Sequence, residues 1–156
     1  MRDPQQVRAE ALHDDAQIEQ RFYEIDPEQR MDAVMRLLAS FRPESCVAFC
    51  FTKQQCQELV EQLTSKSISA AALNGDLEQR DRDQVLAMFA NRSLSVLVAT
   101  DVAARGLDID ALDMVINVEL ARDPEIHVHR VGRTGRAGNQ GLAMSLVAPA
   151  EAHRAQ

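Results

Sequence analysis

A run of arginines and glycines near the C-terminal end holds the densest set of reactive residue types in this sequence. Between His129 and Gly138, three arginines (Arg130, Arg133 and Arg136) lie three residues apart, and three glycines repeat at the same spacing. Each guanidinium stays charged and presents a planar set of donors that matches phosphate oxygens, while glycine allows a close approach of the backbone. The pattern predicts a phosphate-recognition segment, and a solvated basic loop is the alternative interpretation.

The composition is that of a globular protein of single-domain size with an acidic charge. The chain has 156 residues, of which 46% are hydrophobic and 26% charged, and its net charge is -7. A free-standing, non-specific nucleic-acid binder is usually basic, so any nucleic-acid contact should be local or shared with another domain. Only 4% of the residues are aromatic, which argues against a binder that stacks bases on aromatic platforms.

The cysteines and histidines do not form a metal-binding pattern. Cys46, Cys50 and Cys56 are odd in number and contain no CxxC pair, which predicts reduced core thiols in a cytoplasmic protein. His127 and His129 have no cysteine nearby, so we expect no metal site there. The sequence has no apolar run of transmembrane length and no signal-peptide pattern at its start, and we expect no membrane contact.

Apolar strand patterns alternate with amphipathic helix patterns along most of the chain. The predicted strands are 18–25, 46–51, 68–73, 95–100, 114–120 and 141–148, with helices starting at Asp26, after Thr52 and at Asp76. This alternation is typical of βαβ units and predicts an α/β fold, in which a mostly parallel sheet carries helices on both faces. We assign residues 18–150 to this domain, 1–17 to a linker or disordered entry, and 151–156 to the start of a truncated helix.

The carboxyl ends of parallel strands are where such sheets bind ligands. That rule selects Thr52, Asn74–Gly75, Thr100–Asp101 and the loop after Leu120. The loop after the strand 95–100 has small residues for close approach, with Thr100 as a phosphate donor. A tight crossover loop with an Asp–Arg salt bridge remains the alternative there.

Two further features of these loops bear on phosphate binding. The first turn of the helix after Asn74–Gly75 could hold an anion, with Arg82 and Gln79 on one face; a solvated charged face is the alternative. The sequence contains neither a phosphate-binding P-loop nor a dinucleotide fingerprint. Arginines without a P-loop would complete a nucleotide site that another domain builds, as an arginine finger does.

In combination these stretches resemble the C-terminal RecA-like domain of the DEAD-box RNA helicases, within helicase superfamily 2. The resemblance covers about 18–148, and its four motifs occur in the family's order. They are motif IV at 47–52, the Gly and Q-x-x-R stretch at 75–82, motif V at 98–109 and motif VI at 129–136. The resemblance implies a RecA-like three-layer sandwich, and two runs, at 75–83 and 123–130, look most like the bacterial DbpA subgroup.

The resemblance also implies roles for individual residues, in three groups. The ATP-contacting residues would be Asp108, at the ribose, with Arg133 and Arg136, where Arg136 is the expected catalytic arginine finger. The residues on the RNA sugar-phosphate backbone would be Thr52, Gly75, Gln79, Arg82 and Thr100, with Gln79 bracing Arg82. Arg105, His129 and Arg130 would serve the interface with the N-terminal DEAD domain. Mg²⁺ would accompany the ATP, held mainly by that N-terminal domain.

The activity that follows from the resemblance is that of an ATP-dependent RNA helicase, in which closure of two domains opens short duplexes. The RNA could be ribosomal RNA, as for the DbpA subgroup. We expect the present chain to be an excised half that hydrolyses no ATP alone. The alternatives are a DNA-directed superfamily 2 translocase, a non-catalytic RNA- or partner-docking module, and a metabolic nucleotide-binding enzyme. Asn74, Glu119, Ala121 and His127 depart from the usual family pattern.

Overall fold

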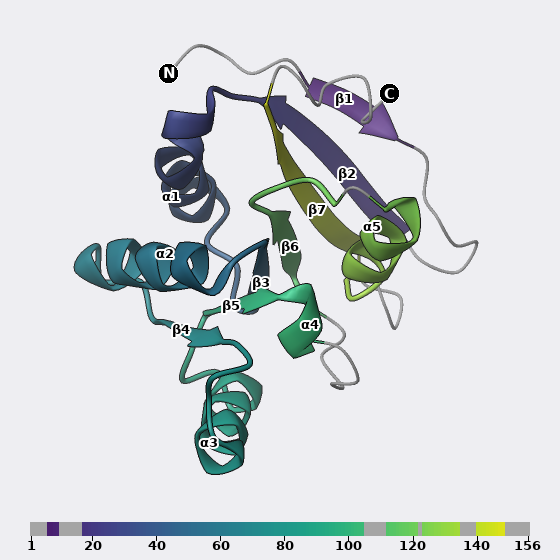
Figure 1. The fold of residues 1–156 in the computed structure, drawn as a ribbon. Helices are drawn as coiled ribbons and strands as arrows, with labels where there is room; N and C mark the ends of the chain where they lie inside the picture. The colour runs from purple at the N-terminus through teal and green to yellow at the C-terminus, as the bar shows by residue number, and fades with distance from the viewer. Residues whose placement is uncertain (1–5, 10–16, 105–111, 122, 135–139, 149–156) are drawn as a thin grey trace.

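The computed structural model of this chain describes residues 6–9, 17–104, 112–121, 123–134 and 140–148. Within these ranges it forms one seven-stranded sheet in the order β1-β2-β7-β6-β3-β5-β4 (Figure 1). The strands are β1 (Gln6–Ala9), β2 (Gln17–Glu24), β3 (Cys46–Cys50), β4 (Ala70–Leu73), β5 (Val96–Thr100), β6 (Met114–Asn117) and β7 (Gln140–Val147). β1 is antiparallel to β2, and the other pairings are parallel. The predicted α/β fold with a mostly parallel sheet is confirmed.

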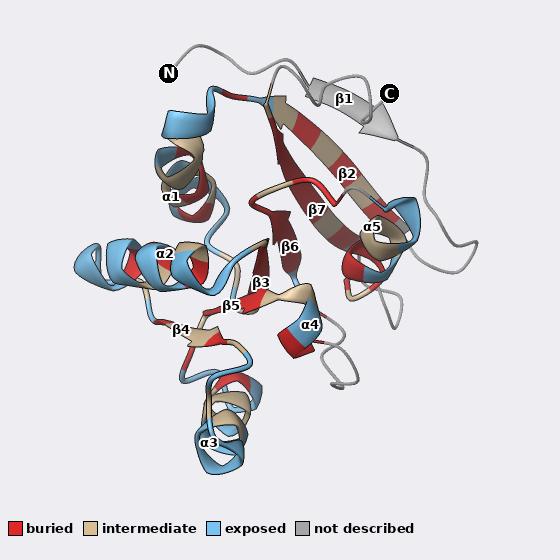
Figure 2. Ribbon diagram, viewed as in Figure 1, coloured by how far each residue is buried: buried red, intermediate tan, exposed pale blue. Residues whose placement is uncertain are grey.

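Helices cover both faces of this sheet, as the alternating pattern predicts. They are the 3₁₀ turn η1 (Pro27–Gln29), α1 (Arg30–Phe41), α2 (Lys53–Ser65), α3 (Gln79–Ala90), α4 (Asp101–Ala104) and α5 (Pro124–Val131). One apolar cluster joins α1 and α2 to the sheet, and others join α3, α4 and α5 to the opposite face. The outer faces of the long helices are exposed while the central strands are buried (Figure 2). In the described ranges, no helix is both long and apolar enough to cross a membrane.

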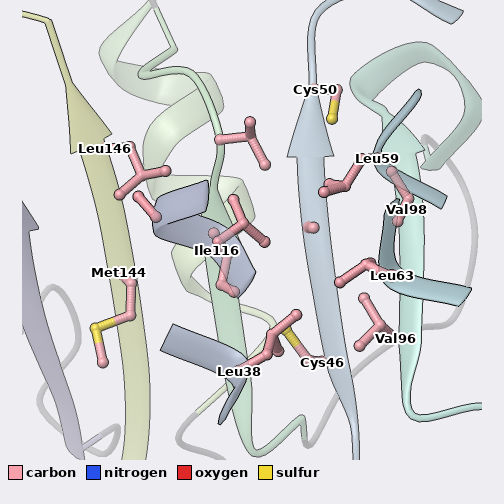
Figure 3. Close-up of a cluster of buried hydrophobic side chains, with 14 of the residues drawn as sticks. Leu38, Cys46, Cys50, Leu59, Leu63, Val96, Val98, Ile116, Met144 and Leu146 are labelled. Atoms are coloured by element: carbon pink, nitrogen blue, oxygen red, sulfur yellow. The ribbon is translucent and has the colours of Figure 1, made fainter. Parts of the chain in front are cut away.

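The larger core cluster lies between the sheet and the helices α1 and α2. Figure 3 shows Leu38, Leu59 and Leu63 of these helices against side chains of β3, β5, β6 and β7. Each leucine that is buried in this way contributes roughly 1.5–3 kcal/mol through the hydrophobic effect. All three cysteines are free and buried, as predicted, and burial raises the pKa of the Cys46 thiol.

Several boundaries differ from the sequence-based predictions. Residues 6–9, expected within an unstructured entry, form the edge strand β1, and residues 151–156 lie outside the described ranges. Asp26 precedes η1 without a side-chain cap bond. The helix predicted to start at Asp76 begins at Gln79, because Asn74 Oδ1 accepts from the backbone N–H of Asp76 (2.9 Å) in a turn.

Among the residues that the structure describes, three with a side chain adopt the left-handed conformation where helices end. They are Arg42 (φ 45°), Ser67 (φ 64°) and Arg92 (φ 67°), which follow α1, α2 and α3. Each lies in the connection that leads to the amino end of the next strand. Residues with a side chain pay a steric cost in this conformation, which glycine avoids.

Candidate functional site

The predicted RNA-contacting residues gather at the carboxyl edge of three adjacent strands. β5 lies between β3 and β4, and Cys50 pairs in register with Thr100 while Leu73 pairs with Ala99. The loops that carry Thr52, Thr100 and Gly75 therefore leave neighbouring strand ends. Two of these loops are joined by an ion pair between Lys53 Nζ and Asp76 Oδ2 (2.9 Å).

Both threonines at this edge also hold the start of a helix. Thr52 Oγ1 accepts a hydrogen bond from the backbone N–H of Gln55 (3.1 Å) and so caps α2, which starts after Thr52 as predicted. Thr100 Oγ1 accepts from the N–H of Ala103 (3.3 Å) in α4. Since a hydroxyl that accepts one bond keeps its own proton, each threonine can still donate to a ligand oxygen.

Gly75 leaves open space at the edge rather than filling a tight turn. A Cβ built at this position would meet nothing within 4 Å, and the residue has no positive φ. The fold itself therefore does not require glycine here. The missing side chain instead keeps the end of β4 accessible to an approaching backbone.

Arg82 and Gln79 of α3 share a helix face, but each donates a hydrogen bond to another residue and not, as the bracing role would require, to the other. Gln79 Nε2 donates to Asp83 Oδ1 (2.8 Å), while Arg82 Nη2 donates to the carbonyl of Ala103 (3.3 Å). The Nε of Arg82 is buried without a hydrogen-bond partner. Arg82 thus joins α3 to α4 and retains an unused donor, which is the kind of group that an anion can satisfy.

Arg130 lies inside the domain and not at its surface, although it was expected at the interdomain face. Its side chain is 1% exposed. Nε and Nη2 donate to the two carboxylate oxygens of Asp101 (2.8 and 2.6 Å), and Nη1 donates to Asn117 Oδ1 (3.1 Å) and to the carbonyl of Glu119 (2.8 Å). The guanidinium also lies over the rings of Phe49 and Phe51, with centroids 5.1 and 5.9 Å away. These contacts correct the expectation of a direct interdomain contact.

The rest of the arginine segment follows directly from the end of α5. Arg133 is half-buried, and its Nη2 donates to the carbonyl of Ala104 (3.3 Å), the last residue of α4. Its own carbonyl accepts from the N–H of Leu112 (3.0 Å), and Thr134 Oγ1 donates to the carbonyl of Leu112. His129 is exposed in the last turn of α5. Three other predicted site residues, Arg105, Asp108 and Arg136, lie outside the described ranges.

The sequence-based prediction missed the helix that carries this segment and the acceptors around Arg130. Asp123 caps α5, because its side chain accepts from the N–H of Glu125 (2.9 Å), and Pro124 occupies the first position of the helix. This Asp-Pro-Glu signal is the same one that predicts the helix after Asp26. The acceptors come from two strand ends, with Asp101 after β5 and both Asn117 and Glu119 at the end of β6. No local pattern links them to an arginine.

His127 of α5 packs on β2 in a half-buried site. Its Nε2 is 3.0 Å from Gln20 Oε1, and its ring is stacked on Phe22 at 6.0 Å. Burial, followed by the positive charge of Arg130, lowers the pKa of His127. In the described parts of the chain, no group of three or more His, Cys, Asp or Glu side chains could hold a metal ion.

Comparisons with known proteins identify the family of this chain. The family of the helicase conserved C-terminal domain matches residues 29–138. The chain is 55% identical to the ATP-dependent RNA helicase DbpA of Escherichia coli (strain K12), over 99% of this chain and 34% of that protein. It therefore spans about a third of the length of this relative.

Solved structures of DEAD-box proteins have the same fold. The E. coli DEAD-box protein SrmB, bound to the regulator of ribonuclease activity A, matches with a TM-score of 0.78 and 32% identity, over 87% of this chain and 79% of that chain. A variant of Dbp5 from S. cerevisiae, bound to RNA and ADP BeF3, matches with a TM-score of 0.77 and 30% identity, over 89% of this chain and 37% of that one. The chain belongs to the DEAD-box RNA helicase family, as a C-terminal helicase domain with the RecA-like fold.

Proposed function

We propose that this chain is the C-terminal half of an ATP-dependent RNA helicase. In this proposal, the edge formed by β3, β5 and β4 binds the RNA sugar-phosphate backbone, and the segment after α5 supplies arginines to an ATP held by an N-terminal RecA-like domain. Closure of the two domains on ATP would then bend one strand and open a short duplex. Contacts to the backbone carry no sequence information, so target choice would lie elsewhere.

The observation that carries the proposal is the meeting of both groups of residues on α4. Arg82, from the RNA side, donates to the carbonyl of Ala103, and Arg133, from the ATP side, donates to the next carbonyl, that of Ala104. Two distant stretches of sequence therefore bring arginines to one four-residue helix, at the strand ends where such sheets bind ligands. The resemblance to a Dbp5 variant solved with RNA and ADP BeF3 adds support.

The roles of the ATP-side residues belong to this proposal. Arg136 would be the arginine finger, Arg133 would assist it, Asp108 would bind the ribose, and Arg105 and His129 would serve the interdomain contact. Mg²⁺ would accompany the ATP and would be held mainly by the N-terminal domain. A cytoplasmic location and a ribosomal RNA target also belong to this proposal, the second through the resemblance of two sequence runs to the DbpA subgroup.

The test uses the full-length protein that contains this chain, with ATP turnover measured with and without RNA. Arg136→Ala should abolish RNA-stimulated turnover, because a finger contributes about 10³–10⁵ in rate, and RNA binding should persist. Arg82→Ala should weaken RNA binding uniformly across sequences and reduce its salt dependence. RNA-stimulated turnover at the wild-type level in Arg136→Ala would contradict the finger assignment.

Gly75 provides a second test of the RNA edge that is separate from charge. Gly75→Ala adds a methyl group where the fold has space, so the free energy of unfolding should stay the same or rise by up to about 1 kcal/mol. RNA affinity should nevertheless fall, because the methyl group occupies the approach to the edge. RNA affinity equal to that of the wild type would count against a backbone contact at Gly75.

The 156-residue chain alone should hydrolyse no ATP.

A further inference from the structure

The side chain of Gln55 links two loops at the binding edge, and no motif assigns it a role there. Its Oε1 accepts from the backbone N–H of Phe51 (3.0 Å), and its Nε2 donates to Glu119 Oε1 (2.6 Å). Its own backbone N–H donates to Thr52 Oγ1 (3.1 Å). One residue in the first turn of α2 therefore fixes the turn around Thr52 and ties that turn to the segment after β6.

The link continues from Glu119 into the arginine segment. The backbone carbonyl of Glu119 accepts from Arg130 Nη1 (2.8 Å), and Arg130 holds the carboxylate of Asp101 next to Thr100. Glu119 thus contacts Gln55 through its carboxylate and Arg130 through its carbonyl. The exits of β3, β6 and β5 and the end of α5 are joined in one continuous polar network.

We propose that Gln55 and Glu119 are positioning residues that hold the Thr52 turn and Arg130 in a fixed relation, and thereby couple RNA contact to ATP turnover. The inference rests on the proposed function, since it assumes RNA at Thr52 and ATP at the segment that follows Arg130. The proposed function itself needs neither residue.

The chemistry at position 55 demands an amide. Phe51 presents a donor and Glu119 presents an acceptor that carries a negative charge, so the side chain between them must accept on one side and donate on the other. A bond to an ionised carboxylate is shorter and stronger than a neutral one. Leucine at 55 would satisfy neither neighbour, and glutamate would place two carboxylates in direct contact.

A reciprocal exchange tests this directly in the full-length protein. Gln55→Glu should lower the ratio of RNA-stimulated to RNA-free ATP turnover about tenfold, which corresponds to a pair coupling of about 1.4 kcal/mol. Glu119→Gln keeps an acceptor for Gln55 and should change the ratio by less than about twofold. In the double variant, the amide introduced at position 119 can donate to the carboxylate introduced at position 55. The ratio should therefore return to within about twofold of the wild type.

The matched control is Gln62→Glu, which makes the same charge change on the exposed face of α2, near its opposite end. It should leave the ratio unchanged, and thermal unfolding of each variant should be followed in parallel. The inference is overturned if Gln55→Glu leaves the ratio intact, which includes an equal fall of stimulated and RNA-free turnover. It is also overturned if the ratio of the double variant fails to recover. A wild-type protein whose ATP turnover does not respond to RNA would overturn the proposed function, and this inference with it.

Discussion

Replacing Arg130 with lysine separates an internal role from an interdomain one. Lysine keeps the positive charge but presents one compact ammonium in place of the planar fork. The structure gives the guanidinium four hydrogen bonds, two to the carboxylate of Asp101 and one each to Asn117 and the carbonyl of Glu119. One ammonium group cannot reach acceptors on both sides of the fork, so at least the two bonds of Nη1 or the two to Asp101 should be lost.

The size of the effect follows from the burial of this side chain. Hydrogen bonds to charged groups contribute about 1.5–3 kcal/mol each, and disrupting a buried pair costs about 3–5 kcal/mol when one partner is removed. Because lysine keeps part of the interaction, we expect the free energy of unfolding to fall by about 2–4 kcal/mol. That is a large part of the roughly 5–15 kcal/mol that stabilises a typical domain.

Urea unfolding of the 156-residue chain measures this change without any partner domain. The control is Arg36→Lys, since Arg36 pairs with Asp32 on the surface, where the two side chains are 53% and 61% exposed. An exposed pair of this kind contributes about 0.3–0.5 kcal/mol, so the control should be close to neutral. A loss below about 1 kcal/mol for Arg130→Lys would refute the internal role and favour the interdomain one.

Other predictions concern stability, pH and charge. Ser67→Gly should raise the free energy of unfolding by about 1 kcal/mol in a urea titration, because it relieves a left-handed φ of 64°; an unchanged midpoint would contradict this. Burial lowers the pKa of His127 in the folded chain, whereas in the unfolded chain this histidine has its ordinary pKa of about 6.5. Below that pH the unfolded chain therefore binds more protons than the folded one, and the free energy of unfolding should fall as the pH drops. His127→Gln should flatten this dependence, and an identical pH profile would exclude it. Asp76→Asn releases Lys53 from its ion pair and should tighten RNA binding in a salt titration, whereas weaker binding would show that Asp76 itself is needed.

The sheet could be predicted from sequence because its central strands are continuously apolar. Cys46–Cys50 and residues 96–99 are such runs, and burial on both faces leaves no other stable place for them. The helix boundaries were less predictable, because Asn74 makes a local turn that postpones α3 to Gln79. The strand at 6–9 had no visible pattern, since its pairing with β2 comes from tertiary contact.

The candidate site was predictable as a set of strand ends but not as individual contacts. Arg130 and Arg133 have the same residue type and lie three residues apart, and neither their type nor their spacing tells which of the two is buried. The difference arises because α5 turns Arg130 toward the rings of Phe49 and Phe51, while Arg133 lies beyond the end of the helix. Such a distinction requires the packing of α5 on the sheet, which a linear motif does not contain.

The three left-handed residues after α1, α2 and α3 have a practical consequence. Arg42, Ser67 and Arg92 precede the amino ends of β3, β4 and β5, whereas the candidate binding residues follow the carboxyl ends of the same strands. The sites where glycine would relieve strain and the sites where ligands would bind therefore lie at opposite ends of these strands. We therefore expect stabilising substitutions, peptide tags or fluorescent labels at the amino edge to leave the opposite edge unaltered.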